Sequence, residues 1–345
     1  MTVIINPSTA AIAAIAEQVA QTCTPSHLAK DFVKVILSQI SLEDFELQDQ
    51  KSWVKILCSL FSASTQRTPG IANIRVNQDA EISTETGSNR STLVIISDDF
   101  PFLVDSFKIV LDNLGISCYA IAHPVLSVTR DGSGTLTATP GDMNESVVWM
   151  EIERQTSEAA ESLIKSISQT LEDVRVSVAD WQAMRNKMLE VAEIAGAQNV
   201  ADCEISAQEA REFLLWAADN HFTFLGFREY RLVGEAENEL LEVIPDTGLG
   251  ILRDNHRSTH SRQAKSLGGR NSQRKNLLIL TKTAARATVH RSTYMDYFGV
   301  LVYDNNGKAI GEYRFIGLLT TSAYNRRPWE IPVVRQNYES VMQAS

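Results

Sequence analysis

The chain has 345 residues, of which 44% are apolar and 21% are charged, and its formal net charge is −10. This length allows about two domains, and the composition is that of an ordinary soluble globular protein. No apolar run approaches the roughly 20 residues of a membrane span, and the N-terminus lacks the basic region of a secretory signal. The acidic balance argues against nucleic acid as the main partner. We therefore expect a cytoplasmic protein with neither a membrane nor a nucleic-acid partner.

The cysteines are too widely spaced for the common metal and disulfide motifs. None of Cys23, Cys58, Cys118 and Cys203 stands in a CxxC or CxxH pattern. A structural zinc site or a disulfide framework is not expected, and a reducing compartment fits this pattern.

The N-terminal region, residues 1–65, has the apolar spacing of amphipathic helices. Its clearest stripe places apolar residues at i, i+3, i+4, i+7 and i+8, namely Trp53, Ile56, Leu57, Leu60 and Phe61. Residues 66–90 are polar and rich in turn formers, which predicts a linker containing one short strand at 71–76.

Residues 91–180 form a predicted α+β unit. An acidic cap at Asp98-Asp99, with Pro101 at about the first helical position, starts a helix that ends at Gly115. A second helix is predicted at 157–170. The predicted strands are 93–96, an extended segment at 116–129 that returns at 135–139 after a turn, 147–152 and 172–178. Their order is βαββαβ, with the helices on one side of an antiparallel sheet.

A helical connector is predicted at 181–219, broken near Gly196, with a capping box from Ser206 to Glu209. Residues 220–325 are predicted to be mostly β, with an Asn305-Asn306-Gly307 hairpin. The expected strands are 222–231, 240–244, 277–282, 286–290, 297–303 and 310–320. In the final segment, 326–345, an amphipathic helix starts at about 332 and the chain stops without a cap, which suggests a fragment of a longer protein.

No catalytic signature is found. Residues 248–253 (GLGILR) lack the third glycine of a dinucleotide fingerprint and favour a β-turn, and the chain contains no GxxxxGK[ST], HExxH or GxSxG. His256 and His260 are four residues apart, but their Ser/Arg-rich surroundings favour exposed loop histidines over a metal site. His123, before Pro124, favours a structural role. The sequence thus predicts no catalytic residue, no cofactor-binding residue and no metal ligand.

A basic stretch spans residues 253–275. It holds seven Lys/Arg and one acid, Asp254, which gives a local charge of +6. A mobile solvated loop is the first interpretation, and we expect 255–275 to stay mobile unless a neighbour orders it. A docking surface for an acidic part of the polypeptide or oligomer is the second. A phosphate or nucleic-acid site is the third, although no aromatic residue interleaves the charges.

The segment from Asp98 to Asp105 is the best candidate for a ligand site. It joins a buried strand to a helix N-terminus, where backbone N–H groups and the helix dipole favour an anion. A simple capped helix start is one interpretation. The other is recognition of an amino-acid carboxylate, with Asp99, Phe102 and Leu103 as the effector-binding residues.

The βαββαβ order and the D-x-P-x-L pattern at 99–103 resemble an ACT domain, a small regulatory module that often dimerises through its sheet. ACT domains often bind amino acids at this loop, which usually carries glycine after the proline. Here that position is Phe102.

Longer strings resemble the N-terminal region of the large NAD-specific glutamate dehydrogenases. They are, in the order of that family, residues 99–106 (DFPFLVDS), 123–126 (HPVL), 219–230 (DNHFTFLGFREY), 248–253 (GLGILR) and 322–325 (SAYN). The resemblance implies an ACT-like domain at 91–180 and a PAS-type β domain at 220–325. It also implies a parent enzyme that uses NAD to convert L-glutamate to 2-oxoglutarate, ammonia and NADH, with catalytic residues beyond Ser345.

The sequence is thus interpreted as a regulatory and assembly segment whose partners are other domains of its polypeptide, other subunits of a homo-oligomer and an amino-acid effector. A free-standing small-molecule sensor and a scaffold without a ligand are the alternatives. Self-association is expected because helices would cover only one face of the predicted sheet, while Val147/Trp149 and Val148/Met150 make both faces apolar.

Overall fold

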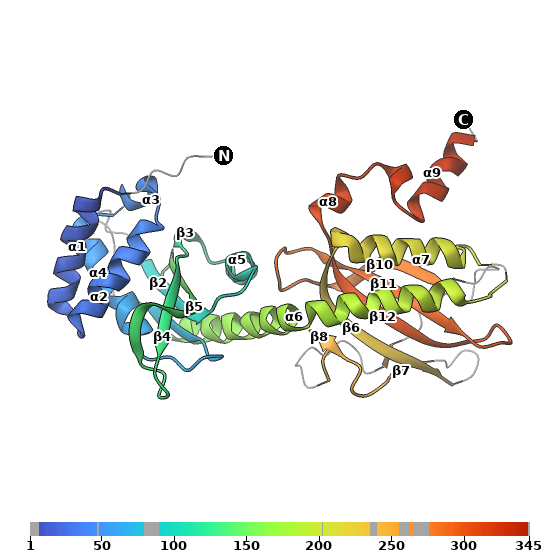
Figure 1. Cartoon of the computed structure of the whole chain (residues 1–345), viewed down its shortest axis with the longest axis horizontal. Helices are drawn as coiled ribbons and strands as arrows, with labels where there is room; N and C mark the ends of the chain where they lie inside the picture. Colours follow the sequence, from blue (N-terminus) through green and yellow to red (C-terminus); the bar gives the residue numbers. More distant parts are fainter. Residues whose placement is uncertain are drawn as a thin grey trace. The chain divides into compact units, whose positions relative to one another are not determined.

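The computed structural model describes residues 7–46, 48–78, 90–201, 203–234, 240–254, 263–264 and 276–343 (Figure 1). The chain folds into two compact units, Met1–Glu172 and Asp173–Ser345. Helices and antiparallel sheets occur in both units, which confirms the α+β class.

The N-terminal residues fold into the predicted helices: α1 (Thr9–Thr22), α2 (Ser26–Ser38), α3 (Leu42–Glu46) and α4 (Gln50–Ser64). Side chains cap two of them, since Ser8 accepts a hydrogen bond from Ala11 N and Asp49 accepts one from Ser52 N.

The first unit contains an antiparallel sheet in the order β1-β2-β5-β3, with β4 also paired to β5. Its strands are β1 (Asn73–Asn77), β2 (Arg90–Asp98), β3 (Cys118–Ala122), β4 (Val125–Arg130) and β5 (Leu136–Glu153). The short strand predicted within the linker is β1. The strands predicted at 135–139 and 147–152 are parts of one strand, β5.

Both faces of this sheet are buried by helices of the chain. On one face Val94, Ile96, Val147 and Trp149 share a core with α1, α2 and α4. On the other face Val148 and its neighbours are also buried, and α5 (Leu103–Leu114) lies on that side of the sheet (Figure 1). The prediction that helices cover one face only is therefore wrong, because the N-terminal helices cover the second apolar face.

Helix α6 runs without interruption from Ser157 to Ala197. The strand predicted at 172–178 is therefore wrong, and the first unit lacks the last strand of a βαββαβ order. The alternation of valines at 174–178 suggested a strand. Five of the buried positions in this part of α6 nevertheless follow the alternating spacing of four and three that marks one helical face. They are Leu163, Ile167, Thr170, Val174 and Ser177.

The second unit continues from α6 with α7 (Ala207–Trp216) and the π-helical turn η2 (Ala217–His221). Its antiparallel sheet has the order β10-β11-β12-β6-β7-β9, and β8 pairs with β6. The strands are β6 (Phe222–Val233), β7 (Leu240–Val243), β8 (Leu249–Gly250), β9 (Gln263–Ala264), β10 (Leu278–Arg286), β11 (Tyr294–Tyr303) and β12 (Ala309–Leu319).

Most strands predicted in this unit are confirmed, as are the helix break near Gly196 and the cap in which Ser206 accepts from Glu209 N. The separate strand predicted at 286–290 is wrong. Strand β10 ends at Arg286, and the chain turns back through the hydrogen bond from Ala287 N to Thr293 O.

The two faces of the second sheet differ in polarity. Phe227, Phe298 and Phe315 lie in an apolar core with Phe213 of α7 and Met188 of α6. The opposite face buries a polar cluster, in which Arg314 Nε donates to Glu312 Oε1 over 3.0 Å and its guanidinium lies 4.0 Å from the centre of the Tyr230 ring. The opposite charges offset part of the cost of burying them.

The C-terminal segment contains α8 (Thr321–Tyr324), the 3₁₀ turn η4 (Pro328–Glu330) and α9 (Val334–Gln343), which confirms the predicted terminal helix. Among the residues that the structure describes, no helix is both long and apolar enough to span a membrane.

Candidate functional site

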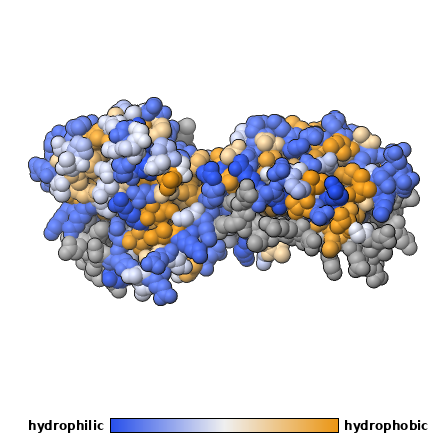
Figure 2. Space-filling view, turned by 90° about the horizontal axis from the view of Figure 1, so that it is seen from below, coloured by the Kyte–Doolittle hydropathy of each residue, from blue (hydrophilic) through white to orange (hydrophobic). Residues whose placement is uncertain are grey.

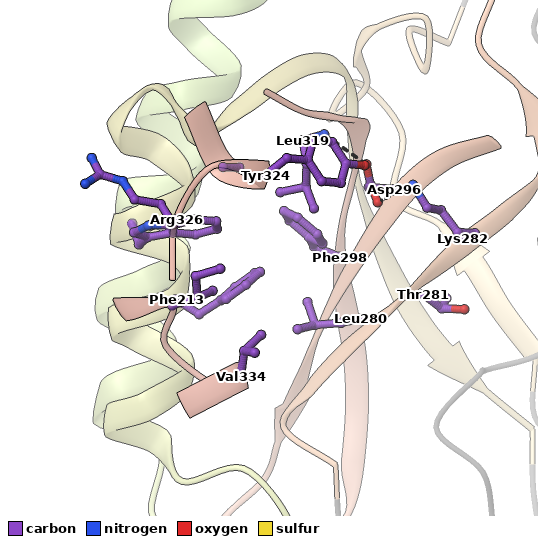
Figure 3. Close-up of a pocket in the computed structure, with 13 residues that line it drawn as sticks. Phe213, Leu280, Thr281, Lys282, Asp296, Phe298, Leu319, Tyr324, Arg326 and Val334 are labelled. Atoms are coloured by element: carbon purple, nitrogen blue, oxygen red, sulfur yellow. Dashed lines mark hydrogen bonds and ion pairs between the residues drawn. The ribbon is translucent and has the colours of Figure 1, made fainter. Parts of the chain in front are cut away.

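The second unit holds a pocket of about 570 Å³ on the helical face of its sheet (Figure 3). It lies between α7, strands β10 and β11, the end of β12 and the C-terminal segment. Its lining residues are Phe213, Trp216, Leu280, Thr281, Lys282, Asp296, Phe298, Leu319, Ala323, Tyr324, Arg326, Ile331 and Val334.

Apolar side chains form the centre of the pocket. Leu280 and Phe298 are cross-strand partners on β10 and β11, so they project from the same face of the sheet. Phe213 approaches from α7, and its ring lies 5.1 Å from that of Phe298 in an edge-to-face arrangement. Figure 3 shows Phe213 and Val334 across the pocket from Leu280 and Phe298. This arrangement gives a concave apolar surface between helix and sheet.

An ion pair borders the apolar centre. Lys282 Nζ lies 2.7 Å from Asp296 Oδ1, and Asp296 Oδ2 accepts a hydrogen bond from Leu319 N over 2.9 Å. The Lys282 side chain is 47% exposed, whereas that of Asp296 is 8% exposed. The carboxylate is therefore held inside the protein, while the ammonium group can still be reached from solvent.

A histidine supports the wall beside α7. The His221 ring stacks on Trp216 with a centroid separation of 4.4 Å. His221 Nδ1 lies 2.8 Å from Trp216 O, and Arg326 Nε lies 3.3 Å from His221 Nε2. Because a carbonyl oxygen accepts and a guanidinium donates, this geometry fits a neutral imidazole with its proton on Nδ1. The guanidinium of Arg326 points away from the centre of the pocket (Figure 3).

No pattern in the sequence predicts this pocket. Its residues come from segments spread between Phe213 and Val334. No local motif marks them, because neighbours such as Thr281 and Lys282 resemble any half-exposed strand. The exposed aromatic residue Tyr324, which is 59% exposed, is the nearest to a signal, since it falls in the family string at 322–325.

The structure places the predicted effector residues at the start of α5, in the first unit. The helix begins at Leu103, and its N-cap is Phe102, with φ 72° and ψ 3° and no capping side chain. Asp99 is exposed and its N–H donates to Asn144 O over 3.3 Å. Leu103 is 1% exposed, so its side chain belongs to the core.

The predicted acidic cap and the proline at the first helical position are both wrong. Asp98 turns away from the helix: its Oδ1 lies 2.7 Å from Arg67 Nη2, and its Oδ2 accepts from Gly70 N. Pro101 precedes the N-cap. The positive φ at Phe102 is the conformation that glycine adopts most easily, so the loop keeps a glycine-like backbone without a glycine.

His123 lies near this loop. Its Nε2 is 2.6 Å from Ser146 Oγ. Burial lowers the pKa of His123 although the charge of Asp99 acts in the opposite direction. The ring therefore favours the neutral state in which it can share the hydroxyl hydrogen bond.

Other predicted features have mixed outcomes. The β-turn at residues 248–253 is confirmed, since Leu252 N donates to Leu249 O. Most of the basic stretch, with His256 and His260, lies outside the described residues. Its first residues are paired, Arg253 with Asp180 at 2.5 Å and Asp254 with Arg228 at 2.7 Å. Among the described side chains, no group of three or more His, Cys, Asp or Glu residues could hold a metal ion.

Comparison with known proteins relates the chain to glutamate dehydrogenases. Residues 32–167 match the family described as glutamate dehydrogenase, ACT1 domain. This match covers much of the first unit, including α4 and the second half of α2, which pack on its sheet.

Three curated relatives are each called NAD-specific glutamate dehydrogenase. The protein of Halomonas elongata is 30% identical over 326 residues, which are 90% of this chain and 20% of that protein. The Pseudomonas aeruginosa protein is 32% identical over 75% of this chain, and the Mycobacterium tuberculosis protein is 24% identical over 72%. The chain spans 20%, 16% and 15% of the length of these relatives, respectively.

Proposed function

This chain belongs to the family of the NAD-specific glutamate dehydrogenases, and we propose that it forms an N-terminal regulatory and assembly segment of such an enzyme. The parent enzyme would convert L-glutamate to 2-oxoglutarate, ammonia and NADH in the cytoplasm. Its NAD site and its catalytic residues would lie in other parts of the polypeptide.

The observation that carries this proposal is the match of residues 32–167 to the glutamate dehydrogenase ACT1 domain. Similarity to the Halomonas elongata protein extends over 90% of the chain, so it includes the second unit as well as the first. Each unit has one candidate site for a small ligand. The first unit offers the N-terminus of α5, and the second unit offers the apolar pocket. A ligand at either site regulates the enzyme only if it binds two states of the enzyme with different affinity.

Enzyme assays on two proteins test the proposal. The full-length enzyme should form NADH from glutamate and NAD. The 345-residue chain alone should neither form NADH nor bind NAD in calorimetry. NADH production by the chain alone, or a full-length enzyme that oxidises another substrate and not glutamate, would refute the proposal.

We also propose the loop from Asp99 to Leu103 as an effector site for an amino-acid carboxylate. Two features support it. Phe102 holds the glycine-like backbone, and the charge of Asp98 is compensated by Arg67 rather than directed at the helix start. Because the Leu103 side chain is buried, this residue would contribute its backbone N–H.

Calorimetry with glutamate and aspartate tests the effector site. Phe102→Gly keeps the backbone conformation and removes the ring, so it should bind the effector at least as tightly as the unchanged chain. Asp112→Asn, at the other end of α5, is the control and should leave binding unchanged. No heat for any amino acid at millimolar concentration, in either protein, would argue that the loop is only a helix start.

For assembly, we propose contacts with other domains of the polypeptide and with other subunits of a homo-oligomer. Within the described residues, β1 pairs only with β2, and β3 only with β5, so each has an edge that could accept a further strand. Tyr119 on β3 is 50% exposed. Figure 2 shows apolar residues gathered in patches on the surface of both units. Light scattering should detect self-association at about 100 μM, and a strict monomer there would count against it.

A sensor that acts without an enzyme, or a scaffold without a ligand, would account for the same modules. Melting temperatures measured with and without candidate ligands distinguish the sensor from the scaffold. A ligand that binds the folded sensor raises its melting temperature, whereas a scaffold shows no such shift.

A further inference from the structure

We propose that the pocket between α7, strands β10 and β11 and the C-terminal segment binds a small monocarboxylate with an apolar or aromatic body. The inference concerns binding to the second unit and does not depend on the glutamate dehydrogenase reaction.

The apolar body would occupy the centre of the pocket. Phe213, Leu280, Phe298 and Val334 surround this space (Figure 3). A volume of about 570 Å³ falls within the range of small-molecule sites. Removing a phenyl-sized group from water against these side chains favours binding in proportion to the apolar area covered.

The carboxylate would bind to Lys282. An ammonium group has three donors, and Asp296 accepts one of them. Because the Lys282 side chain is 47% exposed, its remaining donors can meet a ligand at the edge of the apolar centre. A charge-assisted hydrogen bond there would be partly shielded from water by the apolar body of the ligand itself.

Asp296 does not provide a binding site for a cationic ligand, because both of its oxygens already have partners in the protein. One of its oxygens accepts from Lys282 and the other from Leu319 N, and its side chain is 8% exposed. Because the guanidinium of Arg326 points away from the centre, Lys282 is the cation that a ligand in the pocket would meet. A carboxylate would face Lys282 favourably, whereas an amine would be repelled by it.

The same geometry disfavours small dicarboxylates. Glutarate, for example, would bring a second carboxylate against the apolar centre, where Phe298 and Leu280 offer no donor, and burying that charge is costly. The apolar body of the ligand therefore determines which acids bind, and the contact between its carboxylate and Lys282 determines its orientation in the pocket.

The ligand would also join separate elements of the fold. Ile331 and Val334 of the C-terminal segment form one wall, and Leu280 and Phe298 of the sheet form the other. An occupant in contact with both walls would hold the C-terminal segment against the sheet.

Titration of the 345-residue chain with 3-phenylpropionate tests the proposal. Trp216 lines the pocket, so its fluorescence should change on binding, and calorimetry should give a saturable signal. Phenethylamine, with the same ring and a cationic head, and glutarate, with carboxylates and no ring, should not bind.

Paired variants locate the site. Lys282→Gln should weaken 3-phenylpropionate binding about tenfold or more, whereas Lys308→Gln, at the exposed β11–β12 hairpin, should leave it unchanged. Leu280→Trp should fill the pocket and abolish binding, whereas Ile310→Trp, on an exposed position of β12, should not. Val334→Trp should also fill the pocket, from the opposite wall. It is the variant to use if Leu280→Trp does not fold.

Three results would overturn the proposal: no saturable binding of 3-phenylpropionate, equal binding of phenethylamine, or binding that survives both tryptophan substitutions in folded protein. None of these measurements includes glutamate or NAD. Their failure would therefore leave the proposed enzyme assignment untouched, and failure of the enzyme assay would leave the pocket untouched.

Discussion

Arg335 at the start of α9 forms a two-pronged ion pair with Glu209 in the first turn of α7. Arg335 Nη2 lies 2.6 Å from Glu209 Oε2, and Arg335 Nε lies 2.8 Å from Glu209 Oε1. The same carboxylate accepts a hydrogen bond from Val333 N over 2.6 Å. Glu209 thereby joins the C-terminal segment to α7, and both of these elements carry residues that line the pocket.

Replacing this carboxylate should release α9 locally. Glu209→Gln removes a charge that is 8% exposed and that serves both a guanidinium and a backbone N–H. Hydrogen exchange in residues 333–342 should accelerate at least about tenfold, because a hydrogen bond to a charged group contributes about 1.5–3 kcal/mol. Glu212→Gln is the matched control, since Glu212 also pairs with Arg335 but is 36% exposed, and its effect should be much smaller. Equal effects of the two substitutions would contradict the role given to Glu209.

Glu145 should be the most sensitive charged position in the first unit. Its carboxylate, 1% exposed, accepts from Arg67 and Arg130, which are equally buried. Glu145→Gln should lower the free energy of unfolding by about 3–5 kcal/mol, because it leaves the buried guanidinium of Arg130 without its carboxylate partner and Arg67 with Asp98 alone. Urea unfolding measures this value. Asp142→Asn, on an exposed position of the same strand, should cost less than about 1 kcal/mol. A loss below that level for Glu145→Gln would show that the cluster relaxes or hydrates easily.

Acid should unfold the first unit partly through the same residue. Burial alone would raise the pKa of Glu145, but hydrogen bonds from Arg130 and Arg67 outweigh it and hold the pKa below its usual value of 4.5. A lowered folded-state pKa contributes stability above the unfolded value, and this contribution is lost as the pH falls through the folded-state pKa. The free energy of unfolding should therefore decline below pH 4.5, and Glu145→Gln should flatten that decline. An unchanged slope in the variant would assign the acid sensitivity to other carboxylates.

Cys58 should resist alkylation in the folded protein. Burial, together with its contact with Cys23, raises the pKa of the Cys58 thiol from 9.0 to about 12. At pH near 8 its thiolate fraction, and hence its labelling rate, should be about a thousandfold below that of the unfolded chain. Mass spectrometry after iodoacetamide treatment, with and without urea, compares the two rates. Similar rates in both conditions would show that this part of the helical core opens readily.

Local signals predicted the parts of the fold that depend on local chemistry. The hairpin at 305–307 is one case. Gly307 has the positive φ that the turn requires, and the Asp304 side chain accepts hydrogen bonds from Asn306 N and Lys308 N. Gly115 is another, since it ends α5 in the left-handed conformation.

The errors came from features that tertiary contacts decide. Val174 and Val176 alternate as in a strand, but a buried helical face that continues through Ser177 prevails over β propensity. The apolar run from Val147 to Met150 indicated two buried faces, but it could not show that α1, α2 and α4 would cover one of them. The loop at Phe102 was found from its motif, whereas the pocket was missed because only the folded sheet brings Phe213 and Leu280 together.

The buried Glu145 also has a consequence for how β4 and β5 find their alignment. Glu145 lies opposite Asp98 of β2 and Leu126 of β4. Side chains alternate between the faces of a strand, so a slip of one residue would carry Glu145 to the opposite face. Arg130 would then lose its carboxylate partner, and Arg67 would keep only Asp98. Apolar side chains such as Val147 and Val148 would tolerate that slip, because both faces of β5 are hydrophobic. The carboxylate of Glu145 therefore adds directional information that the apolar residues of this strand lack, and it favours one pairing out of two that would bury similar apolar surface.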